Sequence, residues 1–237
     1  MIVRPADGGV HLITQPDHAR LARTIMEQCV PLRTRPRREM ILHAIAEHDN
    51  GWAEADAAPT VDVRTGQVVD FLHAPLAIRQ GVWPRAVARL ARHPWTAALV
   101  AQHAVTAYAR LRPDADWQAF FADMEATRDA MLGASGMPVD DFMADYAFVR
   151  LGDLISLAFC TGGADEQRFG DWTIAPSGDR VVVTPDVFGG ATIPVQIDAR
   201  EIRRPSYRSD AELRDALTSA TTMTLRGAVV GSARSGS

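Results

Sequence analysis

The stretch Ala44–Trp52, AIAEHDNGW, places His48 and Asp49 side by side where a predicted helix ends. Adjacent helical residues point about 100° apart, so both can reach one metal ion only where the helix end meets a cavity. Gly51 is a typical helix terminator. An imidazole nitrogen and a carboxylate oxygen together suit a transition-metal ion. The stretch therefore predicts two metal ligands at a helix end, with Asp49 as the catalytic residue that also orients a water molecule.

Further candidate ligands lie on the apolar faces of other predicted helices. His18 is followed by apolar residues three, four and seven positions later, so it points toward the core. Asp153 lies on the apolar face of a helix predicted over 139–160, where a buried carboxylate needs a cation or several donors. An ion pair with Arg150 is the alternative reading of Asp153. His103 also lies in an apolar helix, and it is a candidate ligand for a second ion.

Hydrophobic periodicity predicts a mainly α fold class. Apolar residues at helical spacing predict helices over residues 17–30, 37–50, 83–92, 95–111, 115–133, 139–160 and 210–220. A turn sequence predicts a hairpin over 1–15, and short β-prone runs follow residue 170. We expect a single domain over 1–237, with a helical core at 16–162. We expect the hairpin and the strands at 170–230 to form a small β appendage, in which they could pair into one sheet. Residues 231–237 are expected to form a disordered tail.

A long polar stretch separates the second and third predicted helices. Residues 52–81 contain prolines and little periodicity, which predicts a loop that forms one wall of the site. His73 lies in this loop and is a further candidate metal ligand. Trp52 is a candidate substrate-binding residue at the mouth of the site, or else a core residue beneath the loop. Gln15, shortly before His18, is the second candidate for substrate binding.

Composition limits the partners of the chain. The net charge is −4 with no basic run, which argues against a nucleic-acid partner. No apolar stretch approaches the roughly 18–20 residues that span a bilayer, and the first residues lack the features of a signal peptide. Cys29 and Cys160 both fall in apolar patterns, as expected for buried thiols in a reducing compartment. We expect a cytoplasmic protein with a small-molecule substrate and no membrane partner.

The order of the candidate ligands resembles that of the HD superfamily of metal-dependent enzymes. In that superfamily a helical core carries a histidine, a His-Asp pair and a final aspartate, the pattern of His18, His48, Asp49 and Asp153. The sequences QPDHARLA, AIAEHDNGW and the Asp56–Pro59 stretch are similar to a bacterial HD-like family of unknown function, over about residues 1–220. The resemblance implies an HD-domain-like helical bundle that uses these four residues as metal ligands.

The resemblance also implies a function. HD proteins with four ligands resemble mononuclear nucleotide phosphohydrolases, and those with two further histidines resemble dinuclear phosphodiesterases or mixed-valent di-iron oxygenases. His103 and His73 would supply that second site. We expect a hydrolase of a small phosphoester or nucleotide-like substrate that uses metal-activated water. The alternatives are a di-iron oxygenase acting on a small hydroxylated substrate and a non-catalytic metal- or ligand-binding protein. The cofactor is one or two divalent ions, with Fe, Mn, Zn, Co and Ni not distinguished.

Overall fold

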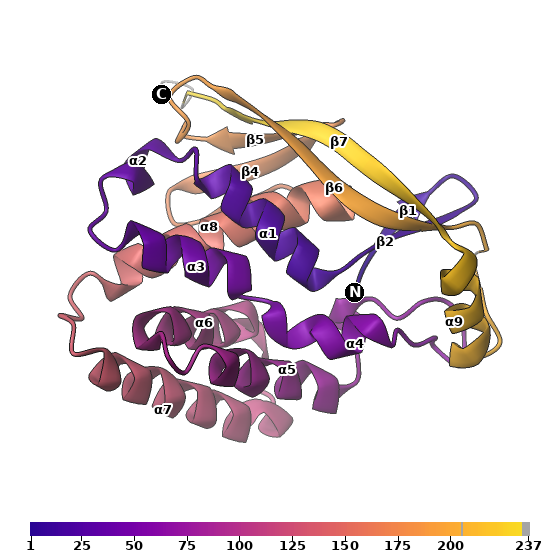
Figure 1. Ribbon diagram of the computed structural model, residues 1–237, viewed down its shortest axis with the longest axis horizontal. Coiled ribbons are helices and arrows are strands. Elements are labelled where there is room, and N and C mark those ends of the chain that lie inside the picture. Colours follow the sequence, from indigo (N-terminus) through magenta and orange to yellow (C-terminus); the bar gives the residue numbers. More distant parts are fainter. Residues whose placement is uncertain (205, 234–237) are drawn as a thin grey trace.

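A computed structural model describes residues 1–204 and 206–233, and it combines a curled sheet with layers of helices (Figure 1). The strands are β1 (Ile2–Ala6), β2 (Gly9–Ile13), β3 (Gln167–Phe169), β4 (Trp172–Ser177), β5 (Arg180–Thr184), β6 (Thr192–Ile202) and β7 (Thr221–Gly231). The α-helices are α1 (Gln15–Met26), α2 (Val30–Arg33), α3 (Arg38–Glu47), α4 (Ala53–Ala57), α5 (Leu76–Arg89), α6 (Pro94–Ala107), α7 (Gln118–Ser135), α8 (Phe142–Thr161) and α9 (Asp210–Ser219). Short 3-10 turns are η1 (Asn50–Trp52), η2 (Phe71–His73), η3 (Ala109–Leu111) and η4 (Ala115–Trp117).

The seven described strands form one mixed sheet in the order β1-β2-β6-β7-β5-β4-β3. The pair β5–β7 is parallel and the other neighbours are antiparallel. In β6, Ile193, Val195 and Ile197 are buried and alternate with exposed residues, so one face of the sheet is covered. Strand β2 pairs with β6, which joins the N-terminal hairpin to strands from the other end of the chain.

The helices form successive layers beneath the covered face of the sheet. Helices α1 and α8 lie next to the sheet, α3 and α6 lie beyond them, and α5 and α7 are outermost (Figure 1). Helix α8 is buried on almost all sides, from Phe142 to Cys160. A helix that is apolar all round needs cover on every face. Helix α8 receives it from the sheet on one side and from α1, α3 and α6 on the other.

The predicted fold class, a mainly α HD-domain-like bundle with a small β appendage, is wrong. The protein is 51% helical and 21% strand, and its sheet has seven strands. Ile174, Val183, Ile193 and Val229 from the sheet belong to the same hydrophobic core as the residues of α1, α3 and α8. The sheet is therefore a wall of the main core. Of the tail predicted over 231–237, residues 234–237 lie outside the described part of the chain.

The predicted loop over 52–81 is also wrong in part. It contains α4, η2 and the first turn of α5, which starts at Leu76 and continues through Pro84. The sequence predicts a helix that starts at 83, because proline is tolerated in the first turn of a helix, whereas Pro84 stands inside α5. Cys29 and Cys160 are free and buried, as expected. Among the helices described, none combines the length and the apolar character that a bilayer crossing requires.

Gly51 allows η1 to pack directly against α5, and its replacement by alanine should destabilise the fold. A Cβ atom at Gly51 would lie 1.9 Å from the carbonyl oxygen of Val82. We expect Gly51→Ala to lower the free energy of unfolding by about 2–3 kcal/mol in urea denaturation, as overpacking does. Gly81→Ala is the matched control, because its Cβ atom would meet nothing within 4 Å and alanine favours the helix. Equal stability of the two variants would contradict this account of Gly51.

Candidate metal centre

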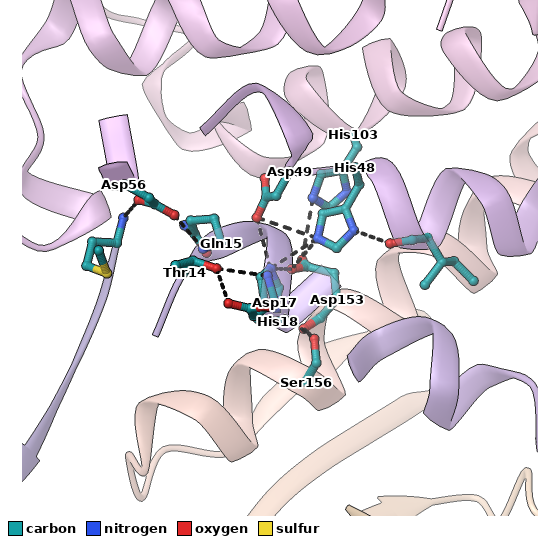
Figure 2. Close-up of polar contacts among 12 residues, drawn as sticks. Thr14, Gln15, Asp17, His18, His48, Asp49, Asp56, His103, Asp153 and Ser156 are labelled. Carbon is teal, nitrogen blue, oxygen red and sulfur yellow. Dashed lines mark hydrogen bonds and ion pairs between the residues drawn. The ribbon is translucent and has the colours of Figure 1, made fainter. Parts of the chain in front are cut away.

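Four helices bring five polar side chains together where α1 and α8 pack against α3 and α6 (Figure 2). The contributing residues are His18 of α1, His48 and Asp49 directly after α3, His103 of α6 and Asp153 of α8. His18 and His48 are fully buried, and Asp49, the most exposed of the five, is only 6% exposed. The structure thus places polar groups from distant parts of the sequence in one buried cluster.

His18 Nε2, His48 Nε2 and Asp49 Oδ2 form a group that could hold a metal ion, and Asp153 Oδ1 lies close to both histidines. His18 Nε2 is 2.9 Å from Asp49 Oδ2 and 3.2 Å from His48 Nε2. His48 Nε2 is 3.6 Å from Asp49 Oδ2. Asp153 Oδ1 is 3.5 Å from His48 Nε2 and 3.8 Å from His18 Nε2. Ligands about 2.1 Å from a shared ion lie about 3.0–3.4 Å apart in octahedral or tetrahedral coordination. The residues present could therefore hold a metal ion.

Hydrogen bonds on the outer side of the His18 and His48 rings fix which nitrogen of each ring faces the cluster. His48 Nδ1 donates to the Ile45 carbonyl oxygen at 2.7 Å. The Ser156 hydroxyl donates to the Asp153 carbonyl oxygen at 3.0 Å, which leaves its oxygen free to accept a bond from His18 Nδ1 at 2.8 Å. Each neutral ring then carries its proton on Nδ1 and presents a lone pair at Nε2. Metal-binding histidines normally make such outward hydrogen bonds.

Burial and neighbouring charges shift the pKa values of the groups in the cluster. Burial lowers the pKa of His48, but the negative charges of Asp49 and Asp153 outweigh it and raise that pKa to about 9. Burial raises the pKa of both carboxyl groups, and the neighbouring histidines more than offset this, so each pKa lies below its ordinary range. Burial lowers the pKa of His103 to about 3. In the metal-free protein His48 is therefore protonated, and its imidazolium supplies the positive charge beside the two carboxylates.

His103 and Arg150 meet the outer oxygen of Asp153. Arg150 Nη1 donates to Asp153 Oδ2 at 2.6 Å, and His103 Nε2 lies 3.6 Å from the same oxygen. His103 Nδ1 lies 3.4 Å from the Tyr146 hydroxyl. The ion pair that was the alternative reading of Asp153 therefore exists, and it leaves Oδ1 facing the histidines. Among the described residues, two groups of three could hold a metal ion. One is His18, His48 and Asp49, and the other is His48, His103 and Asp153.

The cluster is almost closed to solvent. The two largest described cavities, of about 460 and 710 Å³, are lined by other residues. The first lies beside His43 and His93, whose rings are in contact with each other. Side-chain exposure at the cluster is 8% for Asp49 and 3% for Asp153, against 22% for Arg150. Arg150, which contacts Asp153 and is partly exposed, therefore lies between the cluster and solvent.

The structure does not bring every predicted site residue to the cluster. His73 is exposed in η2. Trp52 is 2% exposed and packs in a second apolar core, where it lines a small cavity of about 30 Å³. Gln15 is buried one turn before His18. Its backbone N–H donates to Asp56, and its side-chain Oε1 has no hydrogen bond within the described residues. The substrate-binding roles of Trp52 and Gln15 remain predictions.

Two residues of the site were not assigned to it from the sequence. Ser156 orients His18, and its signal is a hydroxyl one turn after Asp153 on the same apolar face. Arg150 contacts Asp153 directly, and its spacing of three residues indicates an ion pair but not a place at the edge of a metal site. Spacing along one helix reveals such contacts, whereas their relation to ligands on other helices depends on the tertiary fold.

Comparison with known proteins gives a family without an assigned activity. A family model described as "Protein of unknown function (DUF3891)" matches residues 1–204, so the chain belongs to that family. No curated protein and no solved structure matches the chain. The expected membership of the HD superfamily is wrong, because the match is to this family and the seven-stranded sheet departs from an HD helical bundle.

Metal binding should release a proton from His48. Its raised pKa of about 9 keeps the ring protonated at pH 7, and a metal ligand must be neutral, so ion and proton compete. We expect about one proton released per ion at pH 7, measured by titration calorimetry in two buffers of different ionisation enthalpy. Apparent affinity should rise about tenfold per pH unit between pH 6 and 8. An affinity that does not change with pH in this range would contradict the assignment.

Proposed function

We propose that this member of the DUF3891 family is a metal-dependent hydrolase that holds a divalent transition-metal ion and activates a water molecule. One observation carries the proposal. The Nε2 atoms of His18 and His48 face the carboxylate oxygens of Asp49 and Asp153 in one buried cluster, and the neutral imidazoles offer these oxygens no N–H donor. Such a cluster requires a cation. Ligands with nitrogen and oxygen atoms and no sulfur are more typical of catalytic than of structural zinc sites.

The geometry favours one ion over two. Both possible ligand groups contain His48, whose Nδ1 is bonded to Ile45, so only Nε2 is free and it can bind a single ion. A second ion beside Asp153 Oδ2 would meet the positive charge of Arg150 at that oxygen. The proposed ligands are therefore His18, His48, Asp49 and Asp153. Their nitrogen and oxygen atoms suit Zn, Fe, Mn, Co or Ni.

Asp49 is the best placed of the ligands to handle a proton. A bound divalent ion lowers the pKa of water toward neutrality. Asp49 Oδ2 faces His18, whereas Oδ1 has no hydrogen bond to any residue described by the structure. Oδ1 can accept the proton that the water loses as its oxygen attacks the electrophilic atom of the substrate. Asp49 then returns this proton to the leaving group when the substrate bond breaks.

A structural metal site is the second candidate, and the burial of the cluster favours it. A site whose ligands are 0–6% exposed admits a substrate only if side chains at its edge move. A structural ion would stabilise the fold by the linkage between binding and folding and would catalyse nothing. The two candidates differ in whether metal content and hydrolytic activity change together.

Metal content and activity should depend on Asp49 and not on His73. We expect protein purified without chelators to contain about one divalent ion per chain by elemental analysis, and Asp49→Ala to lose it. The native protein should hydrolyse at least one of an aryl phosphomonoester, an aryl phosphodiester and an aryl carboxylic ester, and a chelator should abolish this activity. His73→Ala is the control, because His73 is exposed and outside the cluster.

The outcomes separate the candidates. A native protein without metal would overturn both. A stoichiometric ion whose removal lowers the melting temperature, without hydrolysis of any of the three esters, would replace the hydrolase with the structural site. Loss of the ion in Asp49→Ala without a change in secondary structure by circular dichroism would assign the effect to the ligand and not to unfolding.

A further inference from the structure

Arg150 connects the buried cluster to the surface. Its Nη1 atom donates to Asp153 Oδ2 at 2.6 Å. The side chain of Asp153 is 3% exposed and that of Arg150 is 22% exposed, so the guanidinium spans the boundary between the site and solvent. The inner oxygen of Asp153 faces His18 and His48. Arg150 therefore lies beside the proposed ion, with one carboxylate ligand between them.

The charge of the loaded site favours an anion. Asp49 and Asp153 contribute two negative charges, a divalent ion would cancel both, and Arg150 adds one positive charge. Arginine stays protonated at any relevant pH. A partly buried site with net positive charge attracts an anion, because little water is present to screen the charge. The metal-loaded cluster should thus prefer a substrate with a negatively charged group over a neutral one.

We propose that Arg150 binds the anionic group of the substrate, a phosphoryl group, next to the metal ion. This inference rests on the proposed metal site and names its substrate class. Guanidinium has five N–H donors in a planar fork that matches phosphate oxygens. Within the described residues, only Nη1 of Arg150 makes a hydrogen bond, so the other donors can face a ligand.

Several other arginines near the cluster are already engaged. The chain has no lysine, so arginine must supply any cationic side chain that holds phosphate. Arg20 and Arg23, near His18 in sequence, pair with Asp17 and Glu27 on the surface. Arg128 pairs with Asp129 and donates to Gln102. Within the part of the chain that the structure describes, Arg150 is the arginine with an ion pair to a residue of the cluster.

A purely structural role for Arg150 makes a different prediction. If Arg150 only positions Asp153, its loss should change metal binding and leave anion affinity of the loaded site unchanged. If Arg150 binds the anion, its loss should weaken anion binding at full metal occupancy. Affinity for inorganic phosphate at saturating metal therefore separates the two roles.

The test uses cobalt as the metal and inorganic phosphate as the anion. Cobalt(II) bound at the site absorbs visible light, and a phosphate ion beside it should change that spectrum. We expect the full-length protein to bind about one cobalt ion and phosphate to shift its spectrum saturably. Arg150→Met should keep the cobalt and weaken phosphate binding at least about tenfold, the effect of losing a charged hydrogen bond. Arg128→Met is the control, because this half-buried arginine lies outside the cluster, and its phosphate affinity should equal that of the native protein.

Each result decides a different claim. Failure of the native protein to bind cobalt would overturn the proposed metal site itself. Cobalt binding with no response to phosphate, or with equal phosphate affinity in Arg150→Met, would overturn the anion role alone. If Arg150→Met loses cobalt, Arg150→Lys decides, because it keeps the positive charge beside Asp153 without the fork. Full cobalt binding with weakened phosphate binding in Arg150→Lys supports the proposal, and parallel loss of both contradicts it.

Discussion

The structure depends on two carboxylates that are buried among four helices and require positive charge. Asp49, directly after α3, and Asp153 of α8 both face His18 and His48, and both are less than one-tenth exposed. Each would be costly to bury alone. His48, directly after α3, and Arg150 of α8 supply this charge, and His18 of α1 contacts both carboxylates. The positions of α1, α3 and α8 relative to one another are thus coupled through a single polar cluster.

The sheet makes this arrangement possible by covering the outer faces of α1 and α8. Without it, the apolar residues of α8 that point away from the cluster would face water, because the helix is buried on almost all sides. The sheet also joins the ends of the chain, since β2 pairs with β6. The helix that carries His18 starts directly after β2, so this pairing also holds His18 in place.

The sequence predicts the members of the buried cluster better than the architecture. Inward-facing polar residues on apolar helical faces identify His18, His103 and Asp153, because helical periodicity is a local signal. The sequence suggests that the N-terminal hairpin and the later strands share one sheet, and β2 does pair with β6, but no local pattern reveals the strand order or that the sheet forms a wall of the main core. The order of ligands suggested the HD superfamily, but ligand order constrains chemistry more than fold. The proposed anion-binding role of Arg150 is also not predictable from the local sequence, because it depends on residues that other helices bring to the cluster.

The protonated state of His48 has a consequence for the metal-free protein. Its imidazolium and Arg150 together balance the charges of Asp49 and Asp153, so the cluster is neutral without an ion. The fold therefore does not require metal to avoid an unpaired buried charge, unlike structural zinc sites whose domains unfold when the ion is removed. When a divalent ion replaces the proton, the cluster gains one positive charge. An anion bound at the exposed end of Arg150 would restore neutrality, which links metal occupancy to substrate affinity by charge alone.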